Sequence, residues 1–274
     1  MEIKKVTVAG GGVLGAQIAY AAAFHGFDVT IWGRSEGSIE RAKPRINKVY
    51  ETYTKELELA PRYIGAEFPM YPRSFFENPS EINLEKIEEL KKNNEKAYKD
   101  LKYTVDLEEA FADCDLVIEA IAEKVDEKRA FYEKIKDILK DDAILASNSS
   151  TFMPSMLKDF TGREERFLYL HFANSIHRQN LAEVMGHDTT SKEVIDIVAQ
   201  FARDIGMYPA IIKKENPGYI LNSILVPLLD AALALYGDDI AEPKDIDMDW
   251  KIGSGSPKGL FEMIDIIGIN TVIN

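Results

Sequence analysis

Residues 6–15 read Val-Thr-Val-Ala-Gly-Gly-Gly-Val-Leu-Gly, an apolar run of β type that enters a glycine-rich turn. A helical pattern of small and apolar side chains follows over 16–23, and a second apolar run over 27–32 comes at the spacing of a βαβ unit. The pattern GxGxxG between a strand and a helix gives a tight turn, a close backbone approach and a helix N-terminus that suit a pyrophosphate. We therefore expect a dinucleotide site rather than a purely structural turn. The residues expected to contact the cofactor are Gly10, Gly12, Val13, Leu14 and Gly15.

The second strand ends in an unusual way for such a unit, in Ile31-Trp32-Gly33-Arg34-Ser35. NAD-binding units place Asp or Glu where Gly33 stands, because a carboxylate holds the ribose 2′-hydroxyl. A missing carboxylate removes repulsion against a 2′-phosphate, to which Arg34 can supply a charge-assisted contact and Ser35 a hydrogen bond. The sequence therefore favours NADP over NAD. In the alternative, Arg34 faces solvent and Glu36 holds the ribose of NAD.

Composition narrows the class of protein. The 274 residues are 46% hydrophobic and carry a net charge of −13, with no basic cluster, so nucleic acids and anionic membranes are poor partners. No apolar run approaches the roughly 18 residues of a membrane span, and the chain enters a strand at once, so no signal peptide is expected. The one cysteine, Cys114, lies between two aspartates that hinder thiolate formation. These features predict a cytoplasmic protein without disulfides.

The chain alternates strand and helix up to about residue 210, which predicts an α/β fold of Rossmann type with a mostly parallel sheet. Helices are expected at Lys128–Ile138 and Lys192–Ile205. Residues 36–101 form an insertion, whose charged helix from Glu81 to Lys102 suggests a solvated arm: either a surface excursion or a cover for the substrate entrance. The strands are expected near residues 4–9, 27–32, 102–105, 115–121, 143–147, 167–172, 181–185 and 208–213.

A second, all-helical domain is expected over 214–274, after a first domain over 1–213. Pro217-Gly218 should open a long helix ending at Gly237, and a further helix around Lys258–Ile266 should follow a turn at Gly253-Ser254-Gly255. The apolar face from Leu221 to Leu235 is too broad for a lone surface helix, so we expect a homodimer.

Polar residues collect where predicted strands end. Ser150 follows one strand, and His171 and Asn174 close the next, at the carboxyl edge where open α/β sheets bind ligands. Glu183 lies on the following strand and could face His171. A glutamate that holds one imidazole nitrogen fixes the tautomer, and the other nitrogen can take a proton from an alcohol as a hydride leaves its carbon. The alternative for His171 is a core histidine. His25 and His177 show no such setting and are expected at the surface, and no metal site is expected.

Several motifs together resemble the L-3-hydroxyacyl-CoA dehydrogenases over essentially the whole chain. They include Ser147-Asn148-x-Ser150, His171-Phe172-x-Asn174 with Glu183 twelve residues after the histidine, and Pro217-Gly218-Tyr219-Ile220-Leu221-Asn222. Within that family the chain looks closest to the bacterial diketoreductase branch, as in Leu225-Val226-Pro227-Leu228-Leu229-Asp230.

The resemblance implies roles for individual residues. His171 would be the general acid/base and Glu183 its orienting partner, while Ser150 and Asn222 would hydrogen-bond the reacting oxygen. Asn174, Glu123 and Lys128 would lie along cofactor and substrate. The alternatives without a role in the reaction are a helix cap for Ser150, a bridging amide for Asn222 and a surface ion pair for Glu123 and Lys128.

Three departures from the family keep alternatives open. Gly33 replaces the usual aspartate, and His171-Phe172-Ala173-Asn174-Ser175 replaces the common His-Phe-Phe-Asn-Pro. The chain also ends at Asn274, where relatives continue with further helices, so we expect a shortened form with weakened activity. The expected substrate is a 3-hydroxyacyl-CoA. The alternatives are a free β-keto, diketo or sugar acid, and a non-catalytic nucleotide-binding sensor or crystallin-like protein.

Overall fold

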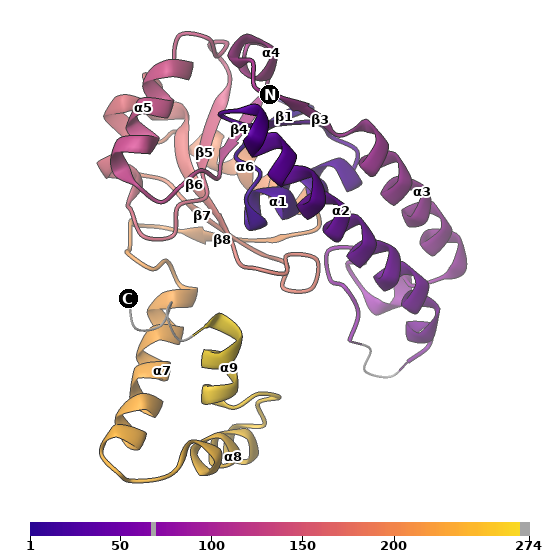
Figure 1. Ribbon diagram of the computed structural model, residues 1–274, viewed down its shortest axis with the longest axis vertical. Coiled ribbons are helices and arrows are strands. Elements are labelled where there is room, and N and C mark those ends of the chain that lie inside the picture. The colour runs from indigo at the N-terminus through magenta and orange to yellow at the C-terminus, as the bar shows by residue number, and fades with distance from the viewer. Residues whose placement is uncertain (67–69, 269–274) are drawn as a thin grey trace. The chain divides into compact units, whose positions relative to one another are not determined.

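The computed structural model describes residues 1–66 and 70–268. The chain divides into two compact units, Met1–Asn216 and Pro217–Asn274, which are called the first and second unit below. The first unit is an α/β layer structure, and the second consists of helices (Figure 1). None of the described helices combines the length and apolar character needed to cross a bilayer.

The first unit is built on an eight-stranded sheet in the order β3-β2-β1-β4-β5-β6-β7-β8. Neighbouring strands run parallel except for β6 and β7, which are antiparallel, so the α/β fold with a mostly parallel sheet is confirmed. The strands are β1 (Lys5–Ala9), β2 (Asp28–Trp32), β3 (Lys102–Thr104), β4 (Leu116–Glu119), β5 (Ile144–Ser147), β6 (Phe167–Phe172), β7 (Leu181–Met185) and β8 (Tyr208–Ile212).

Helices lie on both faces of this sheet (Figure 1). The α-helices are α1 (Val13–Phe24), α2 (Glu36–Leu59), α3 (Leu84–Asp100), α4 (Leu107–Phe111), α5 (Val125–Ile135), α6 (Lys192–Asp204), α7 (Leu221–Gly237), α8 (Pro243–Ser254) and α9 (Leu260–Ile267). Short 3-10 helices cover Ala60–Tyr63, Pro79–Glu81, Pro154–Met156, Lys158–Phe160 and Glu164–Arg166. The helix expected at 128–138 begins three residues earlier, where Asp126 and Glu127 favour a helix N-terminus.

The turn between β1 and α1 needs its glycines. Gly10 has φ 112, and a Cβ there would lie 2.5 Å from the carbonyl oxygen of Ala120. A Cβ on Gly15 would lie 2.0 Å from the carbonyl oxygen of Gly10. Only glycine allows α1 to pack this closely against the strand ends, so the turn is fixed by sterics.

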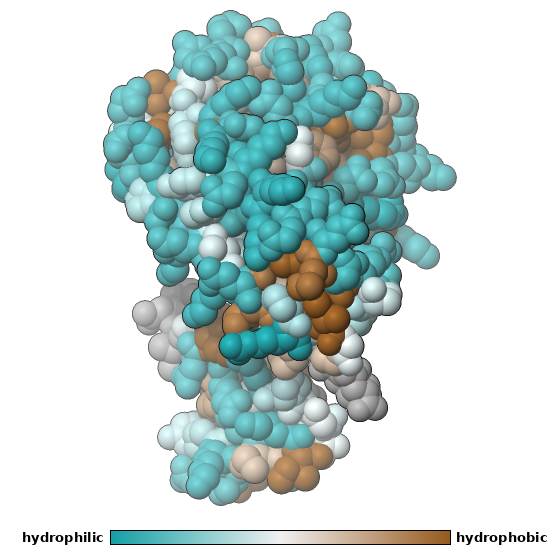
Figure 2. All heavy atoms as spheres, turned by 90° about the vertical axis from the view of Figure 1, so that its right-hand side faces the viewer, coloured by the Kyte–Doolittle hydropathy of each residue, from teal (hydrophilic) through white to brown (hydrophobic). Residues whose placement is uncertain are grey.

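The insertion over 36–101 is a helical hairpin of α2 and α3 that extends from the sheet (Figure 1). Asn83 caps α3 by accepting a hydrogen bond from the Lys86 amide, so the helix begins later than its charged sequence suggested. The hairpin is joined by a stack of Tyr50 on Tyr98, with ring centroids 4.4 Å apart. Figure 2 shows a face of the protein covered mostly by hydrophilic side chains, with hydrophobic ones in several separate groups.

The second unit differs from the sequence-based prediction in three places. Helix α7 begins at Leu221, because Gly218 and Tyr219 have positive φ angles of 78 and 56 and cannot continue a helix backwards. Helix α8, opened by Pro243, was not predicted. It also takes in Gly253, so the expected turn reduces to Gly255, which ends the helix at φ 72.

Candidate active site

The turn between β1 and α1 opens onto a pocket of about 390 Å³. Gly12 is the N-cap of α1 and is exposed, and a Cβ placed on it would meet no atom within 4 Å among the described residues. The free N–H groups of the first helical turn and this open approach suit a pyrophosphate. The residues present therefore fit a dinucleotide. The pocket is lined by Gly10, Gly11, Gly12, Trp32, Gly33, Arg34, Ser38, Ala120, Ile121, Ala122, Glu127, Ala130, Phe131 and Lys134.

The rim of this pocket carries two cations. Arg34 and Lys134 both line it, and Arg34 also forms an exposed ion pair with Glu127 at 3.4 Å. Ser38 lines the pocket as well: its hydroxyl accepts a hydrogen bond from the Ser35 amide and donates one to the Ser35 carbonyl. The motif around Gly33 pointed to Arg34 and Ser35, whereas Lys134 and Ser38 were missed. The spacing Ser-x-x-Ser at a helix start was the available signal for Ser38.

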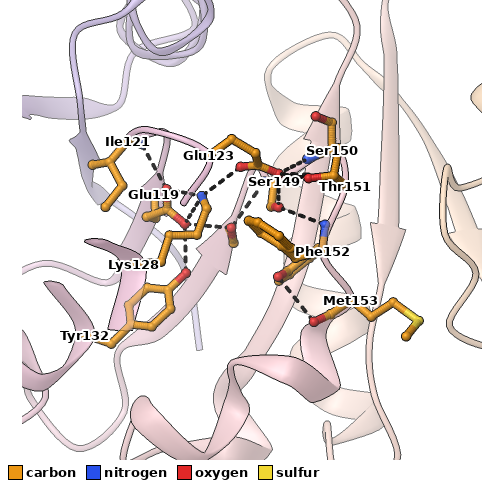
Figure 3. Close-up of polar contacts among 12 residues, drawn as sticks. Glu119, Ile121, Glu123, Lys128, Tyr132, Ser149, Ser150, Thr151, Phe152 and Met153 are labelled. Atoms are coloured by element: carbon orange, nitrogen blue, oxygen red, sulfur yellow. Dashed lines mark hydrogen bonds and ion pairs between the residues drawn. The ribbon is translucent and has the colours of Figure 1, made fainter. Parts of the chain in front are cut away.

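Behind the pocket lies a buried polar cluster centred on Glu119, at the end of β4 (Figure 3). Its carboxylate accepts hydrogen bonds from Lys128 Nζ at 2.7 and 2.9 Å, the Tyr132 hydroxyl at 2.7 Å and the Ser147 hydroxyl at 2.7 Å. Because every partner is present, this buried charge is compensated. Lys128 is 1% exposed, so it is no surface ion pair, and the cluster holds its ammonium in place.

Glu123 connects this cluster to the loop after β5 (Figure 3). One carboxylate oxygen accepts hydrogen bonds from the amides of Ser150 and Thr151, both at 3.1 Å, and from the Ser149 hydroxyl. The other oxygen lies 3.2 Å from Lys128 Nζ. Burial raises the pKa of Glu123, but the Ser149 hydrogen bond, the Lys128 charge and Thr151 outweigh it and lower the pKa to about 2. The loop after β5 is therefore fixed by a carboxylate that is ionised at neutral pH.

His171 and Glu183 face each other across the antiparallel pair β6–β7, where they are register partners. His171 Nδ1 lies 3.0 Å from Glu183 Oε2, and the two side chains are 10% and 2% exposed. The antiparallel register puts both side chains on the same face of the sheet. The carboxylate therefore fixes the ring so that Nδ1 carries a proton and Nε2 can exchange one.

The other predicted polar residues occupy loops at the same edge of the sheet. Ser150 follows β5 and is half-buried, and Asn174 is exposed two residues after β6. The next residue, Ser175, has φ 60, and its amide donates to Gln17 of α1 at 3.0 Å. Gln17, which the sequence did not single out, ties the loop after β6 to the helix of the glycine turn.

Asn222 lies in the second unit, in the first turn of α7, where it is half-buried. Its backbone N–H donates a hydrogen bond to the Gly218 carbonyl oxygen at 3.1 Å. The role of Asn222 in the reaction stays a prediction.

The expectation that His25 and His177 lie at the surface is wrong. His25 is half-buried, with its ring nitrogens 2.8 and 3.0 Å from the carbonyl oxygens of Ala21 and Ser74. The His177 side chain is 13% exposed and lies 3.7 Å from Glu56, and burial lowers its pKa. Their partners come from distant segments, which local sequence does not reveal. Burial, more than the flanking aspartates, raises the pKa of the Cys114 thiol to about 12, so this thiol is unreactive.

The arrangement is equipped for proton and hydride exchange at a carbon–oxygen bond. A pocket whose lining includes Gly12 fits a dinucleotide, and an oriented imidazole lies at the same edge of the sheet. In the described part of the chain, no three His, Cys, Asp or Glu side chains gather into a set that could hold a metal ion.

Comparison with known proteins gives matches along almost the whole chain. The family description "3-hydroxyacyl-CoA dehydrogenase, NAD binding domain" matches residues 5–67 and 76–215, and its C-terminal domain matches 218–274. Mitochondrial hydroxyacyl-coenzyme A dehydrogenase of Sus scrofa is 30% identical, over 98% of this chain and 77% of its own. 3-Hydroxybutyryl-CoA dehydrogenase of Clostridioides difficile is 28% identical, over 98% and 84%. A solved structure of a diketoreductase that acts on dicarbonyl compounds is 42% identical, covers 99% of this chain and 86% of its own, and superposes with a TM-score of 0.85.

Proposed function

The chain belongs to the 3-hydroxyacyl-CoA dehydrogenase family, and from this premise we propose that it moves a hydride between a nicotinamide cofactor and the C3 carbon of a 3-hydroxyacyl-CoA. The observation that carries the proposal is the His171–Glu183 pair, 3.0 Å apart, at the end of β6. A nucleotide pocket alone would suit a sensor or a storage protein, but neither needs an oriented imidazole.

In this proposal His171 is the general acid/base and Glu183 orients it. A nicotinamide cofactor held by the glycine turn would supply the hydride chemistry at the substrate carbon. In the oxidation direction, His171 Nε2 takes the proton of the 3-hydroxyl group as the carbonyl forms, and Glu183 stabilises the resulting imidazolium. In the reduction direction the same proton returns to the new alkoxide. Ser150 and Asn222 would donate hydrogen bonds to the reacting oxygen, as positioned donors that stabilise developing negative charge.

We further propose that the cofactor is NADP rather than NAD. Gly33 places no carboxylate beside the ribose, and two cations, Arg34 and Lys134, line the pocket. Each could form a charge-assisted contact with a 2′-phosphate. Ser35 and Ser38 stand at the same helix start and could donate hydrogen bonds. Gly10, Gly12, Val13, Leu14 and Gly15 would hold the pyrophosphate, while Asn174, Glu123 and Lys128 would support the nicotinamide half.

A second candidate function is the reduction of free 3-keto or diketo acids. The similarity at 42% identity to a diketoreductase favours it. So does Ala173, which is small where the resembling family carries phenylalanine. A coupled assay separates the two candidates. NADPH consumption with acetoacetyl-CoA but not with acetoacetate or a 3,5-diketo acid supports the thioester, and the reverse pattern supports the free acid.

The protein would act as a homodimer formed through the second unit. Exposed apolar side chains are frequent there, in contrast to its small core of Leu229, Ala232, Ile246, Leu260 and Ile264. Uncovered apolar area of this kind is unfavourable in water. The exposed apolar side chains of the second unit include Ile220, Ile224, Val226, Leu235, Tyr236, Ile240, Met248, Ile252 and Ile266.

A further inference from the structure

Residues 173–180 connect β6 to β7 and are called the β6–β7 connection below. The two strands carry the candidate acid/base and its partner. The last register pair before the connection is Phe172 with Ala182, and His171 with Glu183 is the pair next to it. A displacement of the connection is therefore passed almost directly to the imidazole and the carboxylate, because closely packed strands transmit strain.

The β6–β7 connection is a folded turn with a strained backbone. The amides of Arg178 and Gln179 both donate to the carbonyl oxygen of Ser175, each at 2.9 Å. Ser175 has φ 60, and the Ile176 side chain beside it is buried. A positive φ is uncommon outside glycine and persists only where surrounding contacts hold it. The contacts that hold this turn come from three other segments of the first unit.

Two of these segments hold the turn by its backbone. On α1, Gln17 Oε1 accepts hydrogen bonds from the amides of Ser175 and Ile176, at 3.0 and 3.4 Å. Between the two helices of the hairpin, the amide and the hydroxyl of Ser74 both donate to the His177 carbonyl oxygen at 3.2 Å. The first part of the turn is therefore fixed without any charged side chain.

The third segment is α2, which holds the end of the turn through an ion pair. The Arg178 guanidinium donates from Nε and Nη2 to the two carboxylate oxygens of Glu56, at 2.8 and 2.7 Å. Its Nη1 donates to the Met70 carbonyl oxygen at 3.3 Å. The side chain of Glu56 is 10% exposed and that of Arg178 is 37% exposed. A bidentate pair fixes orientation as well as distance, so α2 and the connection are locked in one arrangement.

The Glu56–Arg178 pair differs in kind from the exposed ion pairs of the hairpin. Those pairs join neighbours within one helix and contribute little to stability. Glu56 and Arg178 lie 122 positions apart and are partly desolvated, which offsets much of their attraction. What this pair supplies beyond stability is a defined orientation between two elements. The exposed pairs are Lys43–Glu40, Lys86–Glu89, Lys91–Glu88 and Lys99–Glu95.

We propose that Glu56 and Arg178 are positioning residues for the reaction, and that their ion pair holds the β6–β7 connection so that His171 keeps its 3.0 Å contact with Glu183. Neither residue touches the reacting atoms in this proposal. The effect on the rate rests on the proposed function, whereas the effect on the imidazole does not.

NMR of protein labelled with ¹⁵N in its four histidines tests the positioning without requiring turnover. The two ring ¹⁵N shifts of a neutral imidazole report which nitrogen carries the proton, and the signals of His171 are those lost in His171→Gln. We expect the Nδ1–H tautomer in wild type. In Glu56→Gln and Arg178→Met the other tautomer should rise about tenfold, the scale of one weakened hydrogen bond to a charged group. Arg178→Lys should be intermediate. Glu58→Gln, exposed on the same helix, should match wild type.

Steady-state kinetics tests the consequence for the reaction. In Glu56→Gln and Arg178→Met, kcat should fall about 10- to 100-fold, the range expected when a catalytic group is misplaced by about 1 Å. The dissociation constant of NADPH should stay unchanged, because neither residue lines the nucleotide pocket. The double variant should lose no more than the larger single loss, since the two side chains act as one unit. Circular dichroism checks the folding, and Arg178→Lys replaces any variant that does not fold.

The outcomes separate this proposal from the proposed function. If the His171 tautomer changes in the variants but wild type turns over no substrate, the positioning role stands and the proposed function fails. The positioning role is refuted if folded variants keep the wild-type tautomer and kcat, or if Glu58→Gln causes the same changes. It is also refuted if kcat falls only in proportion to the fraction of protein that is folded.

Discussion

At the scale of single residues, two parts of the candidate site, the His171 ring and the loop that carries Ser150, are held by carboxylates from other elements. Glu183 on β7 orients His171 on β6 at 3.0 Å, and Glu123 orders the loop that carries Ser150. Preorganised groups of this kind act without reorganisation during the reaction. We therefore expect the precision of the site to depend on these partners as much as on the groups that meet substrate.

Replacing His171 by Ala or Gln should lower kcat by about 10²- to 10⁴-fold, the usual contribution of a positioned acid/base. Glu183→Gln should also lower kcat, because the charge that stabilises the imidazolium is lost. Steady-state rates, with circular dichroism as the check of folding, measure both. A folded His171 variant with unchanged kcat would show that the imidazole has another role.

Glu123→Gln should destabilise the fold in a pH-dependent way. The pKa of Glu123 is lowered to about 2 from its ordinary 4.5, so its ionised form favours the folded state. The stabilisation is complete above about pH 4.5 and disappears as the pH falls toward 2; allowing for partial exposure, it is worth about 2 kcal/mol. Urea unfolding of wild type and variant between pH 7 and 3 measures the difference, with Glu133→Gln on the exposed face of α5 as control. A constant difference over that range would contradict this account.

The sequence predicted the identity of most of these residues but not their surroundings. His171 and Glu183 could be paired because strands alternate their faces and both residues lie near strand ends. The buried Glu119–Ser147 contact and the Glu56–Arg178 pair join residues 28 and 122 positions apart in the chain, and no local pattern encodes such partners. Ser149, rather than Ser150, donates its hydroxyl to Glu123, a choice set by the loop's backbone path.

At the scale of elements, the turn from β2 into α2 shows how packing constrains specificity. A Cβ on Gly33 would lie 2.5 Å from Ser38 Oγ and 2.7 Å from Ile39 Cδ1, both in the first turns of α2. An aspartate at this position would therefore displace the Ser38 hydroxyl from the Ser35 backbone, so Gly33→Asp alone would disturb the helix start while altering the ribose site.

Cofactor preference is better tested at the two cations that line the nucleotide pocket, Arg34 and Lys134. Wild type should prefer NADPH over NADH, and Arg34→Ala and Lys134→Ala should each reduce kcat/KM for NADPH about tenfold at low salt with little change for NADH. Lys43→Ala, exposed on α2 and outside the pocket, is the control. The double variant Gly33→Asp/Ser38→Ala should then shift preference toward NADH. A wild-type protein that favours NADH tenfold or more would refute NADP as the cofactor.

The elements with the strongest hydrophobic pattern were the best predicted. The apolar runs at β1, β4 and β5 are fully buried in a parallel sheet, where continuous apolar strands are expected. Helix α8 was missed because its sequence, Pro243–Ser254, alternates acidic and apolar residues with two glycine or serine positions at its end. Its apolar contacts come from α7 and α9, so tertiary packing decides its helicity.

At the scale of the whole molecule, the second unit has more exposed apolar side chains than its small core explains. Ile224, Val226 and Ile252 are 65%, 51% and 76% exposed. Such exposure is costly unless another surface covers it. We propose that a second copy of the chain covers these side chains.

Light scattering at micromolar concentration should therefore give twice the mass of the 30.9 kDa chain. The double variant Ile224→Lys/Val226→Lys should shift the protein to monomer, because two charges cannot be buried in an apolar interface without a penalty. Leu84→Lys, an equally exposed apolar position on α3, should leave the dimer intact. A monomeric wild type would refute the dimer.

The most direct test of the central claim is the absorbance of NADPH when the purified protein meets acetoacetyl-CoA. The account predicts that NADPH is consumed only when both protein and thioester are present, and that 3-hydroxybutyryl-CoA forms in equal amount. If the protein binds NADPH and NADH but neither cofactor is consumed with acetoacetyl-CoA, acetoacetate or a 3,5-diketo acid, the chain is not the hydride-transferring enzyme proposed here.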